Sequence, residues 1–217
     1  MREHKSISIA DQIFEQLEHD ILSGKYARGE TLSELRLSSE MGVSRTPIRE
    51  AIRRLEQEHI LEESGRGVVV VGISKEDMLD MYEIRMKIEG LAARRAAENI
   101  TDAELQEMRD ILDLQRFYVE KQGGNSSDQI KNLDSRFHEQ LYKASGSRVL
   151  FETLYSLHKK IIKFRMASVS KQSRAMQSLE EHESIYRALA AHDPDAAEET
   201  VNRHVVNARE RIVGMEM

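Results

Sequence analysis

The sequence predicts a mainly α-helical protein with two domains, the second of which is a helical bundle. At 217 residues, the chain is long enough for two modest domains that each bury a core. It contains only two prolines, 11 glycines and no tryptophan, so few residues interrupt helices. Apolar residues recur at helical spacing over most of the chain, and only residues 60–71 are typical of β-strands.

The first predicted helix covers residues 8–24. Ile13, Leu17 and Ile21 recur at helical spacing, with acidic residues on the opposite side. Gly24 ends the helix, because glycine favours the backbone conformation found just after a helix C-terminus. We expect this helix to serve as the scaffold of the N-terminal domain.

Two shorter helices joined by a glycine follow. Residues 32–41 form the first of them, and Gly42 provides the turn. Ser44 or Thr46 caps the second helix, and Pro47 lies in its first turn, where a missing N–H is tolerated. A helix, a glycine turn and a second helix in this order predict a helix-turn-helix.

A short β-hairpin is predicted directly after the second of these helices. Residues 60–71 contain two β segments on either side of Gly65, Arg66 and Gly67. Such a hairpin beside a helix-turn-helix forms a wing. Residues 1–72 are therefore expected to form a winged helix-turn-helix domain.

Three arginines recur every four residues along the second helix of this motif. Arg45, Arg49 and Arg53 line one face, with apolar residues turned toward a core. The chain has a net charge of -6, so a cationic face is a local exception that indicates an anionic partner, and phosphate is the natural one. Three arginines alone could equally form a solvated surface, but the helix-turn-helix and the wing favour DNA. Binding through so small a patch should weaken steeply with salt.

Residues 44–51 read Ser-Arg-Thr-Pro-Ile-Arg-Glu-Ala, which resembles the start of the recognition helix in the GntR family of bacterial transcription regulators. The Gly-Val before this run and the Arg-Gly-x-x-Val of the wing are also similar to that family. The resemblance implies a recognition helix in the major groove and a wing tip at the minor groove. The expected DNA-contacting residues are Ser44, Arg45, Thr46, Arg49, Arg53, Gly65, Arg66 and Gly67.

The three arginines differ in their expected contacts. Arg45 or Arg49 fits bidentate pairing with guanine, whereas Arg53 lies deeper along the helix and meets phosphate or solvent. Some relatives carry a further DNA-contacting arginine where this chain has Leu35. Arg36 lies one place later, and the sequence leaves its role open.

Residues 73–217 are expected to form an all-α bundle of six helices. Residues 101–104 form a capping box, residues 74–77 resemble one, and Asp193-Pro194 caps the last helix. Residues 123–127 are expected to be a loop. The predicted helices cover residues 74–99, 101–121, 128–145, 147–167, 173–191 and 194 to near the end.

The composition excludes several kinds of protein and site. The chain has no cysteine, which rules out disulfides, thiolate metal sites and a cysteine nucleophile. Its first residues lack the apolar stretch of a signal peptide, and no apolar run approaches the ~20 residues that span a bilayer. We therefore expect a cytoplasmic protein that does not enter a membrane.

Two polar residues share one face of a helix in the bundle. Asp134 and His138 are spaced i, i+4, and Phe137 and Leu141 flank them, so this face is expected to point partly inward. Alone, such a pair is more often a surface ion pair than part of a metal site. Histidines elsewhere in the bundle change this interpretation.

His182 and His204 lie on the last two helices, on opposite sides of the turn at Asp193. Each is 11 residues from Asp193. At a rise of ~1.5 Å per residue both lie ~16 Å from the turn, level with each other across the hairpin. They are thus able to converge, although His182, between two glutamates, could instead be a charged surface residue. The remaining histidines show no such spacing: His4, His19, His59, His158 and His192.

Three imidazoles and one carboxylate match the ligand preferences of Zn²⁺ and similar divalent ions. The pattern Asp134-x-x-x-His138, followed by His182 and His204, also resembles the metal site of the FadR-like branch of the GntR family, whose effector domain is an all-helical, FCD-type bundle. The resemblance implies that these four residues bind a divalent metal ion. Zn²⁺ is the favoured ion, and Ni²⁺ or Mn²⁺ would suit the same nitrogen and oxygen ligands.

Arg85 lies on the predicted helix of residues 74–99, within a largely apolar stripe. Relatives carry a similar Arg-x-x-x-Glu there, and an intrahelical pair between Arg85 and Glu89 is one interpretation. The other is that Arg85 faces a cavity and binds a carboxylate that also ligates the metal ion. A small organic acid would satisfy both groups, so it is the expected effector.

The leading hypothesis is a ligand-responsive, sequence-specific DNA-binding transcription regulator that is not an enzyme. One helix-turn-helix makes too few contacts for high specificity, so a homodimer on a pseudo-palindromic double-stranded operator is expected, as in the family. The alternatives are a metal-dependent, hydrolase-like enzyme that activates water and a regulator whose metal ion is purely structural. Against an enzyme, Glu181 and Glu183 flank His182 but should point elsewhere, so no base is evident.

Overall fold

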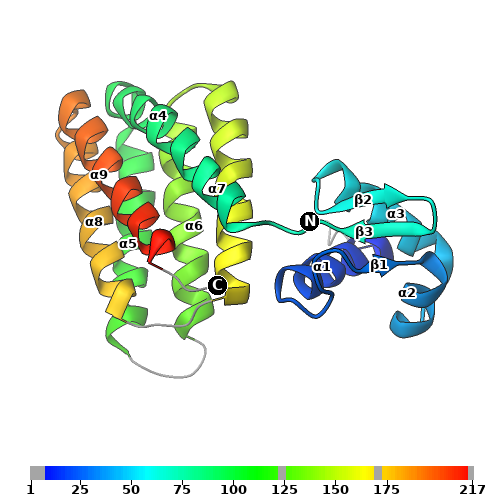
Figure 1. Ribbon diagram of the computed structural model, residues 1–217. Helices are drawn as coiled ribbons and strands as arrows, with labels where there is room; N and C mark the ends of the chain where they lie inside the picture. The colour runs from blue at the N-terminus through cyan, green and yellow to red at the C-terminus, as the bar shows by residue number, and fades with distance from the viewer. Residues whose placement is uncertain (1–7, 122–125, 169–172, 215–217) are drawn as a thin grey trace. The chain divides into compact units, whose positions relative to one another are not determined.

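The protein is described by a computed structural model that covers residues 8–121, 126–168 and 173–214 (Figure 1). The chain divides into two compact units: the described residues up to Ser74 belong to the first, and Lys75–Ile162 and the described residues from Ser173 on belong to the second. Helices dominate both units, and the strands of the described chain all lie in the first. The prediction of a mainly α-helical chain is confirmed.

The N-terminal unit combines helices with a small antiparallel sheet. Its elements are α1 (Ile9–Leu22), β1 (Thr31–Leu32), α2 (Glu34–Met41), α3 (Arg45–Gln57), β2 (Leu61–Ser64) and β3 (Gly67–Val70). Strand β3 lies between β1 and β2 and pairs with both. Helices α2 and α3 flank the turn at Gly42, and β2 and β3 form the wing (Figure 1), so this unit is the predicted winged helix-turn-helix.

Strand β1 differs from the prediction in two respects, since it lies outside residues 60–71 and contains Leu32, the expected start of a helix. Leu32 pairs with Val68 of the wing. The helix starts instead after Ser33, whose backbone is extended and whose hydroxyl accepts a hydrogen bond from the Arg36 N–H. Because an N-cap residue is itself extended, the residues before it are able to add a strand to the sheet.

Helix α3 packs its apolar face into the core of this unit. Its N-cap is Ser44, so Thr46 does not fill that role. The opposite face carries the arginine stripe and stays at the surface. The residues of α3 that are buried with side chains from α1 and the sheet are Ile48, Ala51, Ile52 and Leu55.

Gly67 is required where the wing returns into β3. Its φ of 138° lies in a region that favours glycine. A β-carbon at this position would overlap the backbone carbonyl oxygen of Leu32 in β1. The close approach of these two strands therefore excludes any side chain at residue 67.

Six helices follow Ser74 in the described part of the chain, as predicted. They are α4 (Lys75–Asn99), α5 (Asp102–Glu120), α6 (Ser126–Ala144), α7 (Arg148–Ser168), α8 (Ser173–Ala190) and α9 (Pro194–Val213). Thr101 forms the expected capping box with Glu104, and Asp193 caps α9. Residues 126 and 127 are helical rather than part of the predicted loop, and residues 123–125 of that loop lie outside the described residues.

The centre of this bundle is not purely apolar. Several ionisable or hydrogen-bonding side chains are buried between its helices, which requires partners that compensate for lost water. The buried polar residues of the bundle include Arg85, Glu89, Gln115, His138, His158, His182 and His204.

No described helix combines the length and the apolar character needed to cross a membrane.

Candidate nucleic-acid interface and candidate metal centre

The arginine stripe lies on the exposed face of α3. Arg45, Arg49 and Arg53 are exposed, as are Ser44 and Thr46 at the start of the helix. The side chains of Arg45 and Arg49 have relative exposures of 59% and 49%. Within the N-terminal unit, this face is therefore accessible to a DNA groove.

Glu34 of α2 holds the two arginines nearest the start of α3. Arg45 donates to Glu34 through Nη2 at 2.7 Å, and Arg49 donates through Nε at 2.7 Å and Nη2 at 2.9 Å. Hydrogen bonds from Arg49 and then Arg45 lower the pKa of Glu34 to about 2. The carboxylate is therefore ionised at neutral pH and orients both guanidinium groups.

The wing tip presents Gly65 and Arg66 to solvent. Gly67 is partly buried against the backbone of Leu32. Of the three wing positions expected to contact DNA, Gly67 thus has a structural role that does not depend on DNA.

Arg36, whose role the sequence leaves open, is paired within the N-terminal unit. Its Nε donates to Glu40 and its Nη1 donates to Glu30, both at 2.7 Å. The guanidinium also lies over the ring of Tyr26, 5.6 Å from its centroid. These contacts fix Arg36 on the outer side of α2, where it orders the residues that lead into β1.

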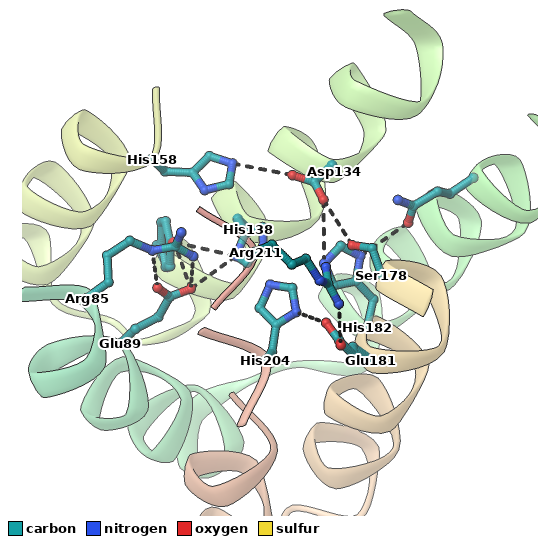
Figure 2. Close-up of polar contacts among 12 residues, drawn as sticks. Arg85, Glu89, Asp134, His138, His158, Ser178, Glu181, His182, His204 and Arg211 are labelled. Carbon is teal, nitrogen blue, oxygen red and sulfur yellow. Dashed lines mark hydrogen bonds and ion pairs between the residues drawn. The ribbon is translucent and has the colours of Figure 1, made fainter. Parts of the chain in front are cut away.

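The four residues expected to bind a metal ion lie together in the centre of the bundle (Figure 2). Ligand atoms of His138 on α6, His182 on α8 and His204 on α9 lie within 4.8 Å of one another. Oδ1 of Asp134, one turn before His138, is 3.7 Å from Nε2 of His182. The structure thus brings together one carboxylate and three imidazoles from three helices.

Each of these three imidazoles has its Nδ1 against the side-chain oxygen of another residue. The pairs are His138 with Glu89 at 3.1 Å, His182 with Gln115 at 3.3 Å and His204 with Glu181 at 2.7 Å. Because such an oxygen only accepts, Nδ1 carries the proton and Nε2 keeps its lone pair. Metal-binding histidines typically have such partners, which fix the tautomer and the orientation of the ring.

The chemistry of the cluster fits a divalent ion. Burial lowers the pKa of His182 well below its usual range, and it also lowers the pKa of His204 against the opposing hydrogen bond to Glu181. Both rings are therefore neutral at pH 7, which is the form that binds a metal ion. Nε2 of His182 is buried without a hydrogen-bond partner in the described chain, as expected for an atom that binds a metal ion.

His158 belongs to this cluster, contrary to the expectation that it has no partner. It lies on α7, is 3% exposed, and its ring centroid is 4.4 Å from that of His138. Its Nε2 is 3.8 Å from Oδ2 of Asp134. The sequence did carry a signal, because His158 shares a helical face with Leu154 and Ile161, both of which are buried.

Glu181 also differs from the prediction, which had both glutamates beside His182 pointing away from the site. Although burial raises the pKa of Glu181, its hydrogen-bond partners lower it overall, so it stays ionised. Glu183, by contrast, binds Arg109 and Arg116. The partners of Glu181 are His204 at 2.7 Å, Asn207 at 2.9 Å and Arg211 at 3.1 Å.

Arg85 is 2% exposed and forms the intrahelical pair with Glu89. Nε donates to Oε2 at 2.6 Å, and Nη2 donates to Oε1 at 3.0 Å. Tyr142 also donates to Glu89, at 2.9 Å. Although burial raises the pKa of Glu89, Arg85 and then His138 hold it well below its usual range. Arg85 is therefore linked to the imidazole cluster through Glu89 (Figure 2).

Two family models match the chain, in the order of its two units. The model described as "Bacterial regulatory proteins, gntR family" matches residues 9–71, which contain the winged helix-turn-helix. The FCD domain model matches residues 80–207, which contain the imidazole cluster. The chain belongs to the GntR family and carries an FCD domain. This GntR-family protein is thus a DNA-binding transcription regulator, and its FCD domain is the effector-binding part.

Curated relatives of this GntR-family regulator are similar to it in sequence over most of their length. It is 31% identical over 196 residues to the uncharacterised HTH-type transcriptional regulator YdhC of Bacillus subtilis, which covers 89% of this chain and 86% of the relative. It is 30% identical over 205 residues to the HTH-type transcriptional repressor RspR of Escherichia coli, covering 94% and 89%. The solved structure of E. coli McbR/YncC shares the fold, with a TM-score of 0.73, 23% identity and coverage of 96% and 98%.

Proposed function

We propose that this regulator responds to a small organic acid bound beside a divalent metal ion and binds its operator as a homodimer. Residues 1–72 bind DNA, and residues 73–217 bind the effector and form the dimer. Because a transcription regulator must reach the DNA of the cell, the protein is proposed to act in the cytoplasm. The observation that carries the proposal is the buried cluster of oriented imidazoles inside an FCD bundle.

The proposed DNA contacts come from the exposed face of α3 and from the wing tip. Arg45 or Arg49 pairs with guanine in the major groove, and Arg53 contacts phosphate. The exposure of all three side chains supports this assignment. The other proposed contacts are Ser44 and Thr46 at the start of α3 and Gly65, Arg66 and Gly67 at the minor groove.

Replacing Glu34 by Gln is expected to raise the affinity for non-specific DNA and to lower the preference for the operator. Removal of a negative charge beside two arginines favours phosphate binding. Loss of the ionised group that orients Arg45 and Arg49 weakens base discrimination, because a site needs side chains held in the productive geometry. Fluorescence anisotropy with operator and scrambled duplexes at several salt concentrations measures both effects.

Glu50→Gln is the matched control for this experiment. It removes an equal charge from the surface of α3. Both variants should gain non-specific affinity, and only Glu34→Gln should lose discrimination. An operator preference that stays at the wild-type level in Glu34→Gln would contradict the orienting role of this carboxylate.

The proposed metal ligands are Asp134, His138, His182 and His204. Zn²⁺ is the favoured ion, and Ni²⁺ or Mn²⁺ are alternatives with the same ligand types. The hydrogen bonds that fix each Nδ1 support this assignment, since they leave Nε2 directed to a ligand. An ion bound here would supply a positive charge that attracts a carboxylate.

Arg85 is proposed to contribute to effector binding. Its pair with Glu89 uses Nε and Nη2, and the Nη1 group is not part of that pair. A carboxylate that bridges the metal ion and this guanidinium would make a charge-assisted hydrogen bond in a site of low dielectric. The effector is therefore proposed to be a small carboxylic acid.

The homodimer is proposed on the basis of apolar side chains that the isolated chain leaves exposed. On α4, Ile84 and Leu91 are 46% and 41% exposed, and two turns of helix separate them. On α5, Leu114 and Phe117 are 46% and 52% exposed and lie one turn apart. Apolar surface of this kind is typical of a face covered by a partner, and in this family a second copy is the natural one.

The site is proposed to bind its ligand without transforming it. Besides Asp134, which is a proposed metal ligand, Glu89 and Glu181 approach the imidazoles, and each of these two is paired with an arginine and with a histidine Nδ1. Their lowered pKa values make them weak bases, whereas hydrolysis needs a base that takes a proton near neutral pH.

The proposed function is tested by selecting bound sequences from a random DNA pool and then measuring affinity for the selected duplex. A palindromic sequence bound by two chains is expected. A panel of mono-, di- and hydroxycarboxylic acids is then titrated, with and without removal of metal by a chelator. One acid is expected to change DNA affinity, and the metal-free protein should keep its fold but lose this response.

The same experiment separates the alternatives. Unfolding on metal removal would identify a structural ion, and chemical conversion of an acid would identify an enzyme. If no acid in the panel changes DNA affinity in the metal-loaded protein, the proposed effector class is wrong.

A further inference from the structure

His158 is a buried histidine that is not among the four proposed metal ligands. It is 3% exposed on α7. Neither of its ring nitrogens has a hydrogen-bond partner in the part of the chain that the structure describes. Burial of a polar group without a partner is unfavourable, so native proteins seldom retain one that has no ligand.

The position of His158 relative to Asp134 suggests what that ligand is (Figure 2). The two carboxylate oxygens of Asp134 face different imidazoles. Oδ1 is 3.7 Å from Nε2 of His182, and Oδ2 is 3.8 Å from Nε2 of His158. Both distances exceed a hydrogen bond, but they suit donor atoms that surround a common ion.

The cluster contains two groups of three residues whose ligand atoms are close enough to bind a metal ion, and both groups include His138. In the first group a ring nitrogen of His138 lies within 4.8 Å of the ligand atoms of His182 and His204, and in the second a ring nitrogen of His138 lies within 4.8 Å of those of Asp134 and His158. Nδ1 of His138 lies against Glu89, so only Nε2 is available. One ring nitrogen binds one metal ion, and the two groups therefore describe two sides of a single site.

We propose that His158 is a fifth protein donor to the metal ion, so that α7 joins α6, α8 and α9 around it. This inference rests on the metal site of the proposed function and extends its ligand set. Donors at ~2.1 Å from an ion are ~3 Å apart when adjacent and ~4.2 Å apart when opposite. Small side-chain movements bring the donors of Asp134, His138 and His158 into that range.

A set of five protein donors limits how the effector can bind the metal ion. If the ion were six-coordinate, five protein donors would leave it one further position, and a carboxylate effector would then bind it through a single oxygen. Four imidazoles and one carboxylate also favour Zn²⁺ or Ni²⁺ over Mn²⁺, because nitrogen-rich sites suit the later transition metals. The inference therefore narrows both the ion and the binding mode of the acid.

The test uses full-length protein stripped of metal and reloaded with one equivalent of Zn²⁺. X-ray absorption at the zinc edge is expected to count four imidazoles in the wild type and three in His158→Gln. Titration calorimetry should show that this variant binds Zn²⁺ roughly 10-fold more weakly or worse, since even outer-shell changes cost 10- to 100-fold. His19→Gln, an exposed histidine of α1, is the matched control and should keep the wild-type values.

Each outcome decides the proposal. Three imidazoles in the wild type, or a His158→Gln variant with unchanged count and affinity, would overturn it and leave the four-ligand site intact. A variant with normal zinc binding but weaker binding of the acid would also overturn it, and would make His158 an effector contact. If the wild type binds no ion at all, the metal site of the proposed function fails as well. Should His158→Gln not fold, the imidazole count of the wild type decides alone.

Discussion

The variant Arg49→Ala is expected to lose specific operator binding while it keeps its fold and its dimer. Arg49 is exposed on α3, so its truncation leaves no cavity in the core. A bidentate contact to guanine is worth about 1–3 kcal/mol, and a homodimer loses it at both half-sites. Fluorescence anisotropy with the selected duplex should show at least a ~10-fold loss of affinity, and circular dichroism should be unchanged.

Two further variants show whether this loss is specific. Arg53→Ala is expected to weaken binding to all sequences about equally and to reduce the salt dependence by about one charge per chain. Arg203→Ala removes the same charge from the exposed side of α9 and should bind DNA as the wild type does. Unaltered operator affinity in Arg49→Ala would remove this residue from the interface.

Replacing His182 by Ala is expected to lower metal occupancy sharply. His182 has no solvent exposure, and its Nε2 is buried without a hydrogen-bond partner in the described chain. Loss of one ligand should weaken binding well beyond the 10- to 100-fold that outer-shell changes cost. Elemental analysis of the purified protein by mass spectrometry, together with zinc titration of the stripped protein, measures both quantities.

His192→Asn is the control for the metal experiment. His192 binds the backbone oxygen of Ala97 through Nδ1, at 2.9 Å, and has a φ of 49°, which asparagine tolerates well. This variant should keep full occupancy. Full occupancy in His182→Ala would instead mean that the ion binds elsewhere in the chain.

Local signals predicted most of the fold. The capping box at Thr101 and the cap at Asp193 depend on neighbours within one turn, so they can be read without tertiary structure. The convergence of His182 and His204 was also predictable, because both lie on one helical hairpin and helical rise fixes their height.

The sequence did not predict that His158 and Glu181 belong to the site, because their positions depend on contacts between helices that are distant in the sequence. His158 meets Asp134 and His138 across the bundle, and no spacing along the chain measures that approach. Glu181 follows a different rule. Adjacent helical residues are about 100° apart, and this rotation turns Glu181 toward α9, where it orients His204, while His182 faces α5 and α6. Because α8 packs against helices on more than one side, a side chain that points away from His182 still contacts a neighbouring helix.

The absence of a side chain at residue 67 bears on how growth-based selections of random variants would be interpreted. Every substitution at Gly67 should score as inactive, just as substitutions at a base-reading arginine do. The cause differs, since a β-carbon there collides with the Leu32 carbonyl and disrupts the pairing of β1 with β3. Only a parallel screen for protein abundance would separate a wing that cannot form from one that forms but no longer binds DNA.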